Sequence, residues 1–209
     1  MAKRLITFSF RLLFLNLVAF LLGIIVMVPL LGVWDSVWFK WFLSLLFSFL
    51  WFMFIWLDTV GFAQKNIQKD KIIARKIAEE QYVPQGDEGK NYAPWHGFLI
   101  GLLSQIPSLI VIVISFFHGL QEWPTLVLRG WYIIFFQSYV TFEGALPYLF
   151  LVYPIILACV SGLAYLNGSV QQRRLETIIE RNKARKAKRV QDDLKNSKKH
   201  PPKKPGARG

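Results

Sequence analysis

The chain has a single cysteine, Cys159, and only 13 acidic residues against 25 lysines and arginines. One cysteine cannot form an intramolecular disulfide, and it cannot by itself provide a zinc or iron–sulfur site. Cys159 lies inside an apolar run, so we expect it to be a small packing residue. The single cysteine therefore predicts that the chain has no structural metal site and no disulfide framework.

Familiar enzyme signatures are also missing. The chain contains neither His-Glu-x-x-His nor Gly-x-Ser-x-Gly, the motifs of many metalloproteases and of serine hydrolases. Glu79 and Glu80 are adjacent, but Pro84 follows where an intramembrane protease motif of this kind would want arginine. We therefore predict no enzymatic activity, no catalytic residue and no cofactor.

Apolar residues are abundant instead, at 54% of the chain, and 16% of all residues are aromatic. Runs of 18 or more nearly uncharged residues are long enough to cross a hydrocarbon layer of about 30 Å as helices. The alternating segments of about ten residues that mark a membrane β-barrel are absent. The composition predicts an all-α integral membrane protein of the cell membrane.

Four membrane spans are predicted in a transmembrane domain covering 1–166. They lie at about 8–31, 37–57, 95–117 and 145–166, and form a four-helix bundle of two hairpins. The loop 58–94 is expected in the cytoplasm, with an amphipathic helix over about 62–82 that ends near Pro84.

The apolar segment 131–142 is ambiguous because about 12 helical residues reach only about 18 Å. The residues from 167 to 209 carry 14 lysines and arginines and four acids, a net charge of +10. The positive-inside rule favours keeping this tail in the cytoplasm. We therefore expect 119–144 to form an extracytoplasmic interfacial or re-entrant helix, with both termini cytoplasmic. A fifth span at 131–142 is the alternative.

Small and polar residues line one face of the third predicted span. Gly97 and Gly101 have the spacing that lets two helix backbones approach closely in a membrane, and Ala158 and Gly162 give the last span a similar face. We expect these faces to pack together, within one chain or between chains of a homo-oligomer. The predicted helix-packing residues are Gly97, Gly101, Gln105, Ser108, Ala158 and Gly162. A substrate path along Gln105 and Ser108 is the alternative.

Pro107 and Pro154 lie inside predicted spans, where each removes a backbone hydrogen bond and can kink its helix. Transporters use interrupted helices as binding sites. The spans, however, have no charged residue near their middle of the kind that ion-coupled pumps use.

The tail from 167 to 209 is predicted to be a helix beginning at a capping box at Ser169, running to about Lys195 and followed by a disordered end. Near an anionic leaflet each lysine or arginine contributes about 1 kcal/mol, and the same charges can hold RNA by releasing counterions. The predicted contact residues for anionic lipid or RNA are Arg173, Arg174, Arg181, Lys183, Arg185, Lys186, Lys188 and Arg189.

These features predict a non-enzymatic scaffold or accessory subunit whose tail contacts anionic headgroups of the lipid bilayer or a cytoplasmic partner. A transporter or channel component is the second hypothesis, and a membrane-insertion or ribosome-docking factor is the third. The layout of a helical bundle with a basic tail is similar to that of membrane insertases with ribosome-binding tails. The chain shares no motif with them and has no arginine at mid-span, so we assign no family.

Overall fold

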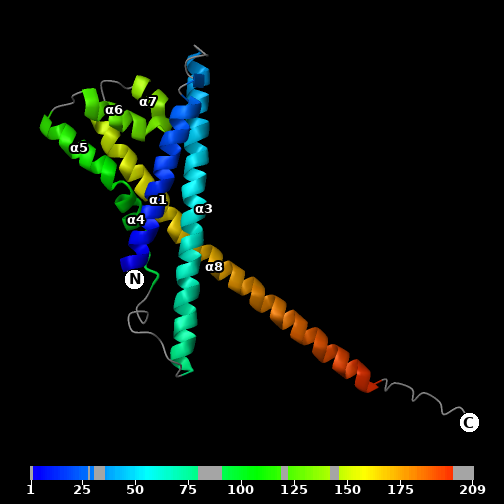
Figure 1. Cartoon of the computed structure of the whole chain (residues 1–209). Coiled ribbons are helices and arrows are strands. Elements are labelled where there is room, and N and C mark those ends of the chain that lie inside the picture. Colours follow the sequence, from blue (N-terminus) through cyan, green and yellow to red (C-terminus); the bar gives the residue numbers. More distant parts are fainter. Residues whose placement is uncertain are drawn as a thin grey trace, which may run out of the picture. The chain divides into compact units, whose positions relative to one another are not determined.

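The computed structural model describes residues 2–27, 29–30, 36–79, 91–118, 122–141 and 146–199. The chain divides into two units, Met1–Ser169 and Val170–Gly209, which are considered separately. All regular structure in the described ranges is helical (Figure 1). The all-α prediction is confirmed for this part of the chain.

The first helix, α1, spans Ala2–Leu22 and passes into a π-helical turn, η1, at Gly23–Met27. A Cβ atom on Gly23 would lie 2.2 Å from Cγ2 of Ile133. Because glycine has no side chain, η2 (Ile133–Phe135) can approach the backbone of this turn closely. The predicted end of the first span, 31, lies outside the described residues.

The second helix, α3, runs without interruption over Val37–Ala78. It therefore combines the predicted span 37–57 with most of the predicted amphipathic helix 62–82. The expected separation is absent because residues 58–61 contain no proline, and Gly61 alone does not break the helix. The predicted end near Pro84 lies outside the described residues.

The third predicted span is divided into α4 (His96–Ser104) and α5 (Ile106–His118), whose axes differ by 57°. Pro107 is the second residue of α5, where its missing N–H is tolerated. The ring of a proline clashes with a helical carbonyl four residues earlier, which for Pro107 is that of Leu103 at the end of α4. The break therefore falls at Gln105, two residues before the proline.

Short helices follow: α6 (Glu122–Trp131), η2 (Ile133–Phe135) and α7 (Phe136–Thr141). The longest, α6, has 10 residues and so reaches about 15 Å, which is too short to cross a bilayer alone. The helix α6 packs against α5. These elements occupy most of the segment 119–144.

The last helix, α8, spans Leu146–Lys199 and continues through Pro154. No new helix begins at Ser169, contrary to the predicted capping box. Its Oγ donates instead to the carbonyl of Leu166, 2.8 Å away, a bond made inside a continuing helix. The predicted disordered end begins at Asn196, but α8 continues to Lys199, and residues 200–209 lie outside the described residues.

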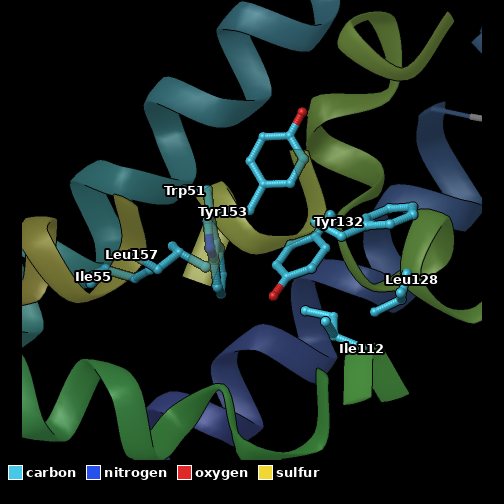
Figure 2. Close-up of a cluster of buried hydrophobic side chains, with 8 residues drawn as sticks. Trp51, Ile55, Ile112, Leu128, Tyr132, Tyr153 and Leu157 are labelled. Carbon is cyan, nitrogen blue, oxygen red and sulfur yellow. The ribbon is translucent and has the colours of Figure 1, made fainter. Parts of the chain in front are cut away.

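The core of the first unit joins α3, α5, α6 and α8. Figure 2 shows its central side chains converging from these helices. Its buried members are Trp51, Ile55, Ile112, Leu128, Tyr132, Phe150, Tyr153 and Leu157. A second, smaller cluster joins Leu5, Phe8 and Leu12 of α1 to Ile100 of α4.

In the described part of the chain, three helices are long and apolar enough to cross a membrane: Lys3–Val26, Val37–Ala78 and Leu149–Gln191. The bent pair α4–α5 makes a fourth if it counts as one span. Large apolar side chains on these helices face outward, including those of Phe14 and Phe49. Such surfaces suit lipid contact.

Candidate functional site

The two small-residue faces meet within one chain. A Cβ atom on Gly101 would lie 2.6 Å from Cα of Ala158, and one on Gly97 would lie 2.9 Å from the carbonyl oxygen of Ser161. The backbones of α4 and α8 are therefore so close that any side chain at either glycine would collide. Ser161 also donates a hydrogen bond of 2.9 Å to the carbonyl of Gly97.

Gly162 also contacts α4, as predicted, because a Cβ atom on Gly97 would lie 3.0 Å from Cα of Gly162. A Cβ atom on Gly162 would in turn lie 2.4 Å from the ring of Phe98 on α4. Cys159, on the same helix, is exposed rather than packed inside the unit, which corrects the expectation of a packing role.

Gln105 and Ser108, the other two predicted packing residues, lie in a buried polar cluster at the break between α4 and α5. Both side chains are buried, at 0% and 2% exposure. Oε1 of Gln105 accepts from the Tyr132 hydroxyl at 3.3 Å and from Nε1 of Trp131 at 3.4 Å. The hydroxyls of Ser108 and Tyr132 are 2.7 Å apart. We call Ser104, Gln105, Ser108, Trp131 and Tyr132 the Gln105 cluster.

The Gln105 cluster also uses backbone groups near the break. Oγ of Ser104 donates to the carbonyl of Gly101 at 2.7 Å, and Oγ of Ser108 donates to the carbonyl of Gln105 at 2.9 Å. Buried polar groups are costly unless hydrogen-bonded. The cluster therefore stabilises the interrupted helix with neutral groups.

A small cavity beside the cluster is lined by Asn16, Trp131 and Tyr132 together with apolar side chains. Its volume is about 10 Å³, which is at the lower limit for one water molecule. Neither Trp131 nor Tyr132 was identified as a site residue from the sequence. The unusual apolar segment 131–142 was the only signal that pointed to this region.

A second polar junction holds the chain that enters α4. Oδ1 of Asp70 accepts from the backbone N–H of Asn91 at 2.7 Å, and Oδ2 accepts from the N–H of Tyr92 at 2.9 Å. The rings of Tyr92 and Tyr165 stack with centroids 5.1 Å apart, and Nδ2 of Asn66 donates to the Tyr165 hydroxyl at 3.0 Å. These contacts join α3 and α8 to the residues that precede α4.

An ion pair joins α1 to α3. Nη2 of Arg11 lies 2.6 Å from Oδ1 of Asp58. The Asp58 side chain is 19% exposed and the Arg11 side chain 60% exposed. This pair gives the one charged residue of α1 beyond Arg4 a specific partner on α3.

The second unit carries the predicted tail contacts. All eight of the cations predicted between 173 and 189 are exposed. A helix turns about 100° per residue, which puts six of them on one half of its surface: Arg173, Arg174, Arg181, Arg185, Lys188 and Arg189. Exposed Leu175, Ile179 and Val190 lie on the opposite half, together with Lys183 and Lys186, whereas exposed Val170 and Ile178 lie on the half with the six cations. This part of α8 is a basic, partly amphipathic helix.

Among the described residues, no group of three histidine, cysteine, aspartate or glutamate side chains is placed to hold a metal ion. No known protein family, curated protein or solved structure matches this chain.

Proposed function

We propose that the protein is a membrane-embedded scaffold or accessory subunit whose basic tail contacts anionic lipid or a cytoplasmic partner. The observation that carries the proposal is the tail helix, whose eight exposed cations between 173 and 189 include six on one half of its surface. Clusters of lysine and arginine on a helix are attracted to anionic membrane surfaces.

The proposed topology is a bundle of four spans in two hairpins, with both termini in the cytoplasm. It counts the bent pair α4–α5 as one span, so that four crossings return the chain to its starting side. The segment 119–144 then lies at the opposite membrane surface as an interfacial or re-entrant element. Support comes from the net charge of +10 after residue 166, which the positive-inside rule favours keeping in the cytoplasm.

Removing residues 170–209 tests the role of the tail, because that cut follows the boundary between the two units. Full-length and truncated proteins are reconstituted in phosphatidylcholine nanodiscs and mixed with vesicles that contain phosphatidylglycerol. We expect the full-length protein to capture the vesicles, the truncated protein to lose capture at least tenfold, and 0.5 M salt to weaken it. Equal capture by both proteins would show that the tail does not bind anionic lipid.

A cytoplasmic partner is tested by affinity purification of the same two proteins from their own membranes. A partner that requires the tail co-purifies with the full-length protein only. Salt-sensitive co-sedimentation with ribosomes would favour the docking hypothesis over the scaffold.

The break at Gln105 favours transport as a second candidate, because transporters place binding sites at interrupted helices. Flux of a candidate solute into proteoliposomes should then survive removal of the tail but fall when Gln105 is replaced by leucine. A scaffold predicts no flux in either protein.

A further inference from the structure

A groove between α1 and α3 collects cations from both helices. Its volume is about 600 Å³, which is within the range of small-molecule sites. We call it the basic groove, and it is lined by Lys3, Arg4, Thr7, Phe8, Arg11, Phe62, Lys65, Asn66 and Lys69. Five of these nine residues are lysine or arginine, and none is acidic.

The antiparallel pairing of the two helices explains this arrangement. Arg11 meets Asp58 at one end of the contact. One turn further along both helices, the rings of Phe8 and Phe62 stack with centroids 4.0 Å apart and planes 4° from parallel. Beyond the rings, Lys3 and Arg4 line the same groove as Lys65 and Lys69. The groove therefore has an aromatic floor and like charges on both walls.

Five cations from two helices line one opening. Like charges that face one another across a short distance repel, and an anion placed between them removes the repulsion. Arginine and lysine donors converging in this way are suited to phosphate oxygens.

The groove lies at the edge of the apolar part of both helices. On α1 no charged residue follows Arg11 up to Leu22, and on α3 none lies between Lys40 and Asp58. The Arg11–Asp58 pair thus marks the end of the hydrocarbon-facing stretch, and the cations beyond it lie at headgroup level. A phospholipid can place its phosphate there while its glycerol and acyl chains contact Phe8 and Phe62.

We propose that the basic groove binds the phosphate-bearing headgroup of an anionic phospholipid. The site lies in the first unit, is separate from the tail and does not depend on the proposed function. Loss of the tail leaves all of its lining residues in place.

Lipid binding is measured on the full-length protein in detergent by native mass spectrometry, with phosphatidylglycerol as the probe and phosphatidylcholine as the neutral comparison. We expect phosphatidylglycerol to be retained at least fivefold more than phosphatidylcholine. The triple substitution Arg4→Gln, Lys65→Gln and Lys69→Gln should remove this preference.

The matched control removes the same charge from exposed positions of α3 that do not line the groove, by Lys71→Gln, Arg75→Gln and Lys76→Gln. We expect this variant to keep its bound phosphatidylglycerol within twofold of the unsubstituted protein. If both triple variants lose lipid equally, net charge accounts for binding and the groove is not a site.

A single substitution tests the groove if the protein with the triple substitution does not fold. Lys65→Glu removes one of the lining cations and adds an acid to the groove, which repels a phosphate. We expect a folded protein with at least fivefold less bound phosphatidylglycerol, and unchanged retention by that folded variant would overturn the proposal.

A soluble phosphate ion is the other ligand that carries the same phosphate oxygens into the groove. We expect 20 mM inorganic phosphate at constant ionic strength to leave bound phosphatidylglycerol within twofold, because the lipid also contacts the aromatic floor. Complete displacement would assign the groove to a soluble anion and overturn the lipid assignment.

Discussion

Single small residues decide how closely the helices of the first unit approach. Gly97 and Gly101 let α4 lie directly on the backbone of α8, and the Ser161 hydroxyl closes the same contact. In lipid, helices gain little from burying apolar surface, so close van der Waals packing of this kind is what holds them together. The neighbouring Gln105 cluster adds hydrogen bonds where the helix is interrupted.

Replacing Gly101 by alanine tests the close contact. The new Cβ atom would lie 2.6 Å from Cα of Ala158, so one of the two backbones must shift. We expect a loss of about 1–3 kcal/mol in stability, as for other overpacked sites, seen as a lower midpoint of thermal unfolding in detergent.

Gly61→Ala is the matched control, because no atom lies within 4 Å of a Cβ built at Gly61 in the middle of α3. The added methyl group raises helix propensity there, so the midpoint should stay unchanged or rise. Equal destabilisation by both substitutions would contradict the packing account.

At the scale of elements, sequence periodicity and length predict the apolar stretches well but their ends poorly. The runs that start near Phe8, Val37 and Ala145 all correspond to helices. The helix α3 continues past Asp58 and α8 continues past Ser169, because polar residues in a sequence do not end a helix unless its backbone hydrogen bonding also ends.

The sequence predicted a contact between two helices only where both helices carry small residues at the same spacing. The glycine spacing in α4 and the small residues of α8 identified one interface. Tyr132 reaches Ser108 across 24 residues and Asn66 reaches Tyr165 across 99, and no local pattern links either pair. The bend at Gln105 was expected near Pro107, but the polar side chains that gather there follow from the positions of α5 and α6 in space.

The ion pair between α1 and α3 gives a prediction at this scale. Oδ2 of Asp58 is buried and has no hydrogen-bond partner among the described residues, so its charge is compensated by Arg11, which pairs with it directly, and by the positive charge of Lys65. Arg11→Gln should lower the unfolding midpoint, and Arg11→Gln combined with Asp58→Asn should recover part of the loss.

A double-mutant cycle over these variants and Asp58→Asn measures the coupling between α1 and α3. We expect about 1 kcal/mol, the upper end for exposed pairs, because the Asp58 side chain is only 19% exposed although the Arg11 side chain is 60% exposed. Strictly additive effects would show that the pair does not hold the two helices together.

At the scale of the whole molecule, the number of membrane spans decides on which side of the membrane the basic tail lies. Three long apolar helices alone would leave the termini on opposite sides of the membrane, whereas the bent pair α4–α5 as a fourth span puts them on one side. The net charge of +10 after residue 166 favours the second arrangement. Both proposals for the tail require it to face the cytoplasm.

Labelling of a cysteine introduced at Ser197 tests this arrangement directly, in a Cys159→Ala background that removes the only native thiol. A membrane-impermeant maleimide applied to intact cells should leave position 197 unmodified and should modify it after the cells are opened. A cysteine at Ser36, beyond the first span, should react in intact cells as the matched positive control. Modification of position 197 in intact cells would place the tail outside and contradict the four-span topology.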